Sequence, residues 1–317
     1  MSRVAIALAL FEPEMDLLAE QLRSLVDQSH RDWILYARDE SRDEEHGRAA
    51  MELVMRMVPA ENLARVWRDS RRLGPAGNFF AILEVAVADI TWSHLAFCDQ
   101  DDIWMPQKLT RLLAEFTEPQ VKGAHSDLML VDRDSRKLAS SCWKNEGRDL
   151  QPACTESLLW RNVVTGCASM FHRHAVKAAR PWPKLANSKP LFFHDHWLAL
   201  CALSEGELRA VAEPLVKYRQ HGRNVVGAAQ VKTELPPLSA WRAKALRGFA
   251  EREALRRELN SRSMPAPSWM KLVFWVLRSW LVGRRGYGRA LGQCLLGWCL
   301  SLGGRQVELA PPKSVSP

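Results

Sequence analysis

Apolar runs alternate with helical segments along the first part of the chain. Residues 4–11 and 33–37 are apolar runs of strand length, and between them leucines recur at helical spacing over residues 15–26. Strand, helix and strand in this order predict the βαβ unit of a parallel sheet. Further strands are predicted at residues 63–67 and 95–98, and further helices at 47–58, 79–88 and 108–116. The expected fold class is α/β, with ligands bound at the carboxyl ends of the strands.

The pattern after residue 120 is less regular. Residues 124–132 and 213–227 predict strands, the second ending in a polar glycine loop, whereas residues 133–160 are polar and loop-rich. Residues 163–171 predict a strand with Gly166 inside it, where a bulge or a close ligand approach is expected. Short helices are predicted at residues 174–179 and 198–203.

Three carboxylates directly follow the strand predicted at residues 95–98, namely Asp99, Asp101 and Asp102. Carboxylates are rarely buried without a partner, so two interpretations fit. A divalent cation, Mn²⁺ or Mg²⁺, could be chelated together with the phosphates of a ligand. Alternatively, the segment is an acidic turn before a helix, with Asp102 as its N-cap and Pro106 in its first turn.

Two other segments carry candidate chemistry. Residues 74–78 form a glycine-bearing loop before a helix, preceded by two arginines, which fits either a phosphate-facing loop or an ordinary strand-to-helix connection. His194, Asp195, His196 and Trp197 stand together at a predicted helix start. Zinc binding by the two histidines lacks a third ligand at a recognisable spacing, and Asp195 as a helix N-cap is the structural alternative.

Charge and cysteine content separate the tail from the rest of the chain. Residues 241–317 hold 14 Lys and Arg against 4 Asp and Glu, a net charge of +10, whereas the first 240 residues have a net charge of −2. The seven cysteines are odd in number and lack a C-x-x-C pair, which predicts reduced thiols in a cytosolic protein. The N-terminus lacks a small-residue cleavage site, which favours a core strand over a signal peptide.

The tail predicts helices of unusual composition. Residues 241–262 form an Arg-rich helix, and the apolar runs at 268–282 and 290–302 are too short or too interrupted by charge to span a membrane. Apolar helices flanked by Trp and Arg are typical of the membrane interface, and a basic tail would be attracted to anionic lipid. Alternatively, these helices pack on the preceding domain.

The order of these features resembles family 2 glycosyltransferases of the GT-A fold, most closely bacterial rhamnosyltransferase-type members. The family's Gln-Leu-x-Ser-Leu-x-x-Gln helix is matched by residues 21–28, its Gly-x-x-x-Asn loop by 74–78, and its Cys-Asp-Gln-Asp-Asp-Ile-Trp-x-Pro-x-Lys-Leu stretch by 98–109. Its His-Asp-x-Trp and Tyr-Arg-Gln-His-Gly-x-Asn-Val-Val-Gly segments are matched by 194–197 and 218–227. Two turns depart from the family, at residues 9–12 and at Glu40, where the family has Asp.

The resemblance implies a role for each matched residue. It implies that Asp101 and Asp99 bind the metal, with His221 as a weaker candidate. The residues implied to bind the nucleotide-sugar donor are Asp39, Asn78, Asp99 and Gln100. Asp195 is implied to be the general base. Asp102 is implied either to support the metal ligands without binding the metal itself or to cap a helix. Residues implied to contact the acceptor or a closing loop are Gly166, His194, Trp197 and Trp104.

The function expected from the resemblance is inverting, metal-dependent transfer of a sugar to a lipid-linked or surface-polysaccharide acceptor. The donor carries dTDP, UDP or GDP, with dTDP-rhamnose as the first choice. Residues 1–235 would form the catalytic domain, with a nucleotide-binding half to residue 110 and an acceptor half from 111, and residues 236–317 a tail on the inner face of the cytoplasmic membrane. One rival is a non-catalytic nucleotide-sugar-binding or scaffolding protein. Nucleic-acid binding by the tail is disfavoured because no recognition motif is present.

Overall fold

The computed structural model describes residues 2–148, 153–183, 193–220, 238–264, 266–281 and 299. The chain divides into two compact units. The first comprises Met1–Cys154 and Asn162–Gln230, and the second Thr155–Arg161 and Val231–Pro317. The predicted tail starts at residue 236, so the second unit also includes a segment from earlier in the chain.

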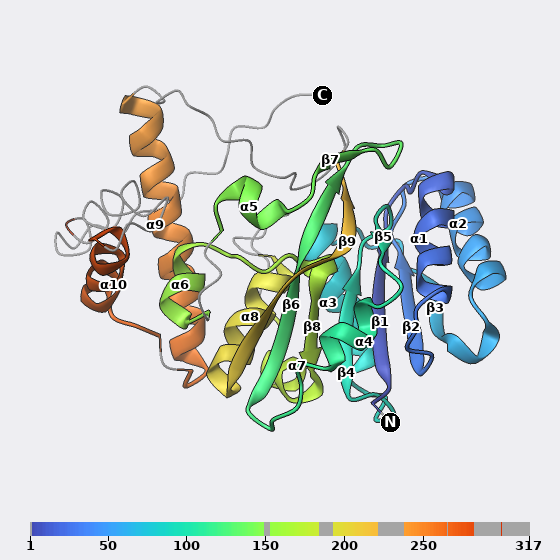
Figure 1. The fold of residues 1–317 in the computed structure, drawn as a ribbon, viewed down its shortest axis with the longest axis horizontal. Helices are drawn as coiled ribbons and strands as arrows, with labels where there is room; N and C mark the ends of the chain where they lie inside the picture. Colours follow the sequence, from blue (N-terminus) through green and yellow to red (C-terminus); the bar gives the residue numbers. More distant parts are fainter. Residues whose placement is uncertain are drawn as a thin grey trace. The chain divides into compact units, whose positions relative to one another are not determined.

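The first unit begins with four parallel strands in the order β3-β2-β1-β4. The strands are β1 (Val4–Leu10), β2 (Trp33–Asp39), β3 (Leu63–Arg68) and β4 (His94–Cys98), and the helices between them are α1 (Met15–Val26), α2 (Glu44–Met57) and α3 (Gly74–Ala86), with a 3₁₀ turn η1 (Ala60–Asn62) before β3. The predicted βαβ arrangement is therefore confirmed (Figure 1). In this order the loops after β1, β2 and β4 meet at one edge of the sheet.

The sheet extends beyond β4 through β8, β6, β9 and β5. The pairs β4–β8, β8–β6 and β9–β5 are antiparallel, whereas β6 and β9 run parallel. These strands are β8 (Ser169–His172), β6 (Val121–Val131), β9 (Glu207–Arg219) and β5 (Ile103–Trp104), and β7 (Lys137–Ala139) pairs with β6 outside this path. The helices of this half are α4 (Lys108–Leu113), α5 (Cys142–Glu146), α7 (Arg173–Ala178) and α8 (His194–Glu205). Because β8 runs against β4, its amino end lies beside the carboxyl end of β4.

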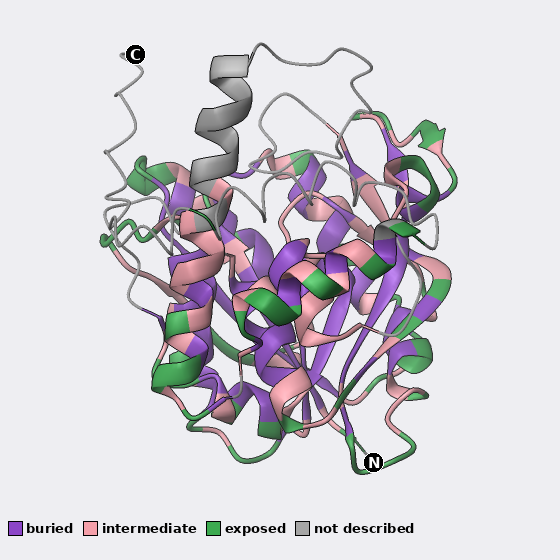
Figure 2. Ribbon diagram, turned by 90° about the vertical axis from the view of Figure 1, so that its left-hand side faces the viewer, coloured by how far each residue is buried: buried purple, intermediate pink, exposed green. Residues whose placement is uncertain are grey.

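Helices cover both faces of the sheet. Successive strand residues point to opposite faces. The even-numbered residues of β1 share a core cluster with Leu18, Leu22 and Leu25 of α1. On the other face Phe97 of β4 packs edge-on against Phe79 of α3, with ring centroids 5.1 Å apart. The strands between these layers are largely buried (Figure 2).

Several predicted boundaries are wrong. The strand predicted over residues 163–171 is confined to Ser169–His172, because Gly166–Ala168 form a 3₁₀ turn, η2. Helix α8 begins at His194 rather than at residue 198, with Phe193 at the N-cap, so Asp195 is not an N-cap. Asp102 is not one either, because β5 follows it and the N-cap of α4 is Gln107.

The second unit contains α6 (Thr155–Trp160), α9 (Leu238–Ser261) and α10 (Trp269–Leu281). Trp160 and Val276 form a small buried cluster, and the Arg252 guanidinium lies 4.0 Å from the centre of the Trp160 ring. Apart from Cys299, the segment at 290–302 lies outside the described residues. Among the residues that are described, no helix has both the length and the apolar character needed to cross a membrane.

Candidate active site

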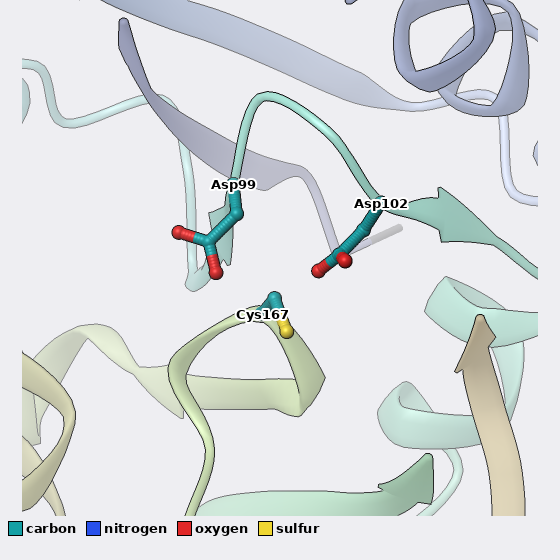
Figure 3. Close-up of side chains that lie close together, drawn as sticks. All are labelled: Asp99, Asp102 and Cys167. Atoms are coloured by element: carbon teal, nitrogen blue, oxygen red, sulfur yellow. The ribbon is translucent and has the colours of Figure 1, made fainter. Parts of the chain in front are cut away.

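Asp99 and Asp102 meet a thiol at the carboxyl end of β4. Their carboxylate oxygens and Cys167 Sγ all lie within 4.8 Å of one another (Figure 3). Cys167 belongs to the turn η2 before β8, and the antiparallel pairing of β8 with β4 places this turn beside the loop that follows β4. Within the described ranges, these three residues are the group of His, Cys, Asp and Glu side chains arranged to hold a cation.

The charges of these carboxylates are poorly compensated by the protein. Burial, followed by the charges of Asp101 and Asp195, raises the pKa of Asp99 to about 7. Burial and the charges of Asp101 and Asp99 raise the pKa of Asp102 well above its ordinary value. Asp102 Oδ2 is buried and has no hydrogen-bond partner in the described part of the chain. Such a site favours protons or a bound cation.

Arg219, which the sequence analysis did not single out, holds the loop that carries these carboxylates. Its backbone N–H donates to Asp102 Oδ1 at 3.0 Å, and its Nε donates to the carbonyl oxygen of Asp101 at 2.8 Å. The same guanidinium donates to Glu20 Oε2 at 2.6 Å. The pairing of β5 with β9 brings the end of β9 to this loop. The signal was present, because Arg219 stands in the Tyr-Arg-Gln-His segment.

Lys108 is a second residue that the sequence analysis missed, although it belongs to the stretch at residues 98–109. Its buried Nζ donates to the carbonyl oxygen of Cys167 at 2.5 Å and lies 3.0 Å from the centre of the Trp104 ring. Burial lowers the pKa of Lys108 to about 7. Trp104, predicted to contact the acceptor or a loop, is buried beneath this ammonium group.

Asp195 lies in the first turn of α8 and is fixed by backbone donors. One oxygen accepts from the N–H of Gly166 at 2.9 Å, and the other accepts from the N–H of His196 at 2.6 Å and from Asn162 Nδ2 at 3.3 Å. Burial raises the pKa of Asp195 to about 6. Because its charge raises the pKa of Asp99, the two carboxylates belong to one electrostatic site.

Gly166 gives α8 room to approach this turn. A Cβ atom at Gly166 would lie 2.8 Å from His194 Nε2 and 3.6 Å from Asp195 Cβ. The close approach at this glycine is made by a helix of the protein itself, and the ligand approach expected there stays a prediction.

His194 and Trp197 are packed inside the first unit. The His194 ring packs against both Phe79 and Phe97, with centroid distances of 4.0 and 4.5 Å, and burial lowers the pKa of His194 to about 3. Trp197 Nε1 donates to the carbonyl oxygen of Ala179 at 3.0 Å. Neither histidine of this segment belongs to a three-residue ligand group in the described ranges, so the zinc interpretation gains no support there.

The residues at the end of β2 are bonded to one another. Asp39 is buried, accepts from Ser41 Oγ at 2.6 Å and lies 3.3 Å from Arg68 Nε. Arg38 donates to Glu40 Oε2 at 3.1 Å and to Asn78 Oδ1 at 2.8 Å. Asp39 and Asn78, predicted to bind the donor, therefore fix the rim of the sheet in this structure.

Glu40, where the family has Asp, points inward. Its carboxylate accepts from Arg38 and from the N–H of Leu73, the latter at 2.8 Å, and burial raises its pKa. It thereby ties the loop before α3 to the end of β2.

Gln100 clamps the loop after β1. Its Nε2 donates to the carbonyl oxygen of Phe11 at 3.1 Å, and its Oε1 accepts from the N–H of Phe11 at 2.8 Å. The next residue, Glu12, has φ +44°, a left-handed conformation in which glycine is common. The unusual turn at residues 9–12 still forms, and the predicted donor contact of Gln100 stays a prediction.

Two predicted metal ligands are not part of the ligand group formed by Asp99, Asp102 and Cys167 in the described residues. Asp101 lies between Asp99 and Asp102 on the same loop but is not in the ligand group with Cys167. His221 lies outside the described residues. Their assignment to the metal therefore remains a prediction.

Comparison with known proteins decides the family. Residues 12–178, just over half of the 317-residue chain, match the sequence profile described as Glycosyl transferase family 2. The chain belongs to glycosyltransferase family 2. An uncharacterized glycosyltransferase of Nostoc sp. is 26% identical over 156 residues. The alignment covers 48% of this chain and 45% of that protein, so the chain spans less than half of this relative's length.

Solved structures share the fold of this chain. The mannosyltransferase PcManGT from Pyrobaculum calidifontis, in complex with GDP-Man and Mn²⁺, superposes with a TM-score of 0.52 at 17% identity, covering 96% of this chain and 76% of that one. S. aureus TarS 1-349 in complex with UDP-GlcNAc superposes with a TM-score of 0.53 at 13% identity, covering 97% and 93%. At such identities the likeness shows the fold, and the predicted GT-A fold is confirmed.

Proposed function

We propose that this family 2 member transfers a sugar from a nucleoside diphosphate donor to a hydroxyl group of a saccharide acceptor, with inversion at the anomeric carbon. The observation that carries the proposal is that the carboxylates of the β4 loop and the carboxylate of Asp195 belong to one site. Asp99 and Asp102 face Cys167, and Asp195 is close enough for its charge to raise the pKa of Asp99. Transfer needs both a site for the charged diphosphate and a base for the acceptor.

The residues of the β4 loop fit a divalent cation. The buried Asp102 Oδ2 has no hydrogen-bond partner among the described residues, and carboxylate oxygens are the ligands that Mn²⁺ and Mg²⁺ prefer. Asp99 and Asp102, together with Asp101, would hold the ion. When bound, such a cation neutralises the charge that develops on the leaving diphosphate.

Asp195 acts as the general base. Its carboxylate takes the proton of the acceptor hydroxyl while that oxygen forms a bond to the anomeric carbon, and the bond from this carbon to the diphosphate breaks. The electron pair of the broken bond leaves with the nucleoside diphosphate. With a pKa of about 6, Asp195 is ionised at neutral pH and is a stronger base than an exposed aspartate. The N–H groups of Gly166 and His196 hold it in place.

The first donor to test is dTDP-rhamnose, because the sequence motifs are most similar to those of rhamnosyltransferase-type enzymes. The proposed acceptor is a lipid-linked saccharide of a surface polysaccharide. PcManGT and TarS were solved with GDP-Man and UDP-GlcNAc, so the panel of donors should include GDP- and UDP-sugars.

The test is donor turnover with Mn²⁺ or Mg²⁺ across this panel, with and without saccharide acceptors. We expect the wild type to consume one donor at least ~100-fold faster than Asp101→Ala, since a charge-neutralising group at the leaving diphosphate is being removed. Equal, slow turnover by both proteins would favour the rival, a nucleotide-sugar-binding protein without catalysis. The matched control is Asp27→Ala, because Asp27 is an exposed residue at the C-cap of α1 and is not in the ligand group of the β4 loop.

We further propose that the second unit binds the inner face of the cytoplasmic membrane. Helix α10 buries Leu272 and Val276 but exposes Met270, Phe274 and Leu281, with relative exposures of 65%, 72% and 74%. Exposed apolar side chains beside cationic ones are typical of interfacial helices, and the tail has a net charge of +10.

Flotation of the protein with anionic vesicles tests this second proposal. Phe274→Gln should reduce the bound fraction, whereas Met55→Gln, which alters an exposed apolar residue of α2, should leave it unchanged. Wild-type protein that stays with the soluble fraction at low salt would contradict it.

A further inference from the structure

A thiol faces the proposed cation site, and the sequence motifs give it no role. Cys167 is 1% exposed, and its Sγ lies within 4.8 Å of ligand oxygens of both Asp99 and Asp102. In Figure 3 the two carboxylates extend from one loop and the thiol from the facing turn. A metal bound between the two segments would therefore encounter sulfur as well as oxygen.

Hydrogen bonds from Lys108 and Arg219 hold the two segments in place. Lys108 Nζ donates to the carbonyl oxygen of Cys167, which leaves the side chain of Cys167 turned toward the carboxylates. On the other side, the N–H of Arg219 donates to Asp102 Oδ1, and Oδ2 is left buried without a hydrogen-bond partner in the described ranges. Burying a carboxylate oxygen without a hydrogen bond reduces the stability of the fold unless a bound ligand interacts with that oxygen.

We propose that Cys167 is a thiolate ligand of the cation held by Asp99 and Asp102. The site then offers two oxygens and one sulfur, and it takes thiophilic divalent cations such as Zn²⁺ and Cd²⁺ in addition to Mn²⁺. On binding, the S–H bond breaks, the proton passes to solvent, and a sulfur electron pair forms the bond to the metal. This inference rests on the proposed function, because the same carboxylates hold the ion in both.

A sulfur ligand changes which cation the site prefers. Carboxylate and water ligands suit Mg²⁺ and Mn²⁺, whereas thiolates favour softer ions. Loss of the thiolate should therefore weaken the binding of Cd²⁺ much more than the binding of Mg²⁺. We expect Cys167→Ser to lower Cd²⁺ affinity by roughly 10- to 100-fold and Mg²⁺ affinity by less than about threefold.

The experiment uses the full chain with Cys154, Cys294 and Cys299 replaced by serine, which leaves the other four cysteines. Metal-free protein is titrated with Cd²⁺ while the ultraviolet sulfur-to-cadmium charge-transfer band is recorded. Released protons are counted in weak buffer. The comparison variants are Cys167→Ser and Cys201→Ser, the latter a buried cysteine of α8 outside the ligand group. Only Cys167→Ser should lose the charge-transfer band. This variant should also release about one proton fewer for each Cd²⁺ ion bound.

X-ray absorption of the Cd²⁺-loaded chain decides the matter if Cys167→Ser does not fold. Absence of a sulfur scatterer around the metal, or a charge-transfer band that survives in Cys167→Ser, overturns the inference. Sugar transfer with Mn²⁺ separates the two proposals. If transfer persists while Cd²⁺ binds without sulfur, only the role of Cys167 is wrong. If neither transfer nor cation binding is found, the proposed function fails as well.

Discussion

Buried charges are treated differently at the ends of β2 and β4. At the end of β2, Glu40 accepts hydrogen bonds from Arg38 and from the N–H of Leu73. At the end of β4, Asp102 keeps one buried carboxylate oxygen without such a partner among the described residues, and burial together with Asp101 and Asp195 raises the pKa of Asp99 to about 7. Both loops lie at the same edge of the sheet, but among the described residues only the second leaves a buried carboxylate oxygen without a hydrogen-bond partner.

The difference separates residues that shape a site from residues that hold a ligand. A buried polar group whose hydrogen bonds are all made within the protein stabilises its loop, whereas one left incomplete gains from a bound partner. Judged by their carboxylates, the β2 loop frames the site, and the β4 loop with Cys167 and Asp195 is the proposed reacting centre. The following four experiments test that division.

Replacing Asp195, the proposed general base, should have the largest effect. Asp195→Asn keeps the shape of the side chain but cannot accept the acceptor proton, so transfer should fall by about 10²–10⁴-fold. In the wild type the rate should decline as the pH falls through about 6, because protonation removes the base. Steady-state kinetics across pH measure both. Residual activity in Asp195→Asn with the wild-type pH profile would place the base elsewhere.

Breaking the frame should cost stability. Arg38→Met leaves the buried Glu40 without its charge partner, and the free energy of unfolding should fall by about 3–5 kcal/mol. Urea unfolding followed by circular dichroism measures the change. The double variant Arg38→Met with Glu40→Leu should recover much of the loss. A single variant as stable as the wild type would contradict the view that this pair supports the loop.

The metal-free protein should lose stability as the pH rises. The folded pKa of Asp99, about 7, lies above the ordinary 3.8, so folding favours the protonated form. The associated stabilisation is complete below about pH 4 and is lost as the pH rises through about 7. Asp99→Asn should therefore be more stable than the wild type at pH 8, on the order of 1–3 kcal/mol. Thermal unfolding at pH 5 and pH 8, with and without Mn²⁺, tests this sign, and Mn²⁺ should restore wild-type stability at pH 8.

Loosening the loop after β1 should have the smallest effect. Gln100→Leu removes two hydrogen bonds to the backbone of Phe11, each worth about 1 kcal/mol. The KM for the donor should rise a few-fold while kcat changes little. Gln120→Leu, at an exposed position before β6, is the control. A fall in kcat without a change in KM would assign Gln100 to the chemical step.

Local patterns were sufficient to predict the parallel half of the sheet. Helix α1 was predicted with its observed bounds, because its leucines recur at helical spacing and its neighbours are apolar strands. The acidic loop after β4 could be recognised because three carboxylates follow a buried strand. Whether Asp102 capped a helix could not be decided from sequence, since the answer depends on β5 pairing with the distant β9.

The remaining residues of the centre depend on contacts between distant parts of the chain. Cys167 reaches Asp99 through the antiparallel register of β8 with β4, which no local pattern encodes. The inward direction of Glu40 depends on Arg38 and on the N–H of Leu73, which belongs to the loop before α3. Arg219 and Lys108 stood in recognised motifs, but their partners are backbone atoms, and residue identity does not reveal these.

The consecutive residues Gly166 and Cys167 contact both ends of the proposed reaction. The Gly166 N–H holds the base, the Cys167 carbonyl accepts from Lys108, and the Cys167 thiol faces the carboxylates of the donor side. A displacement of this short turn therefore changes the orientation of Asp195 and the surroundings of the cation together. If the proposed roles hold, a ligand that displaces either of these two residues should change both the position of the base and the binding of the cation.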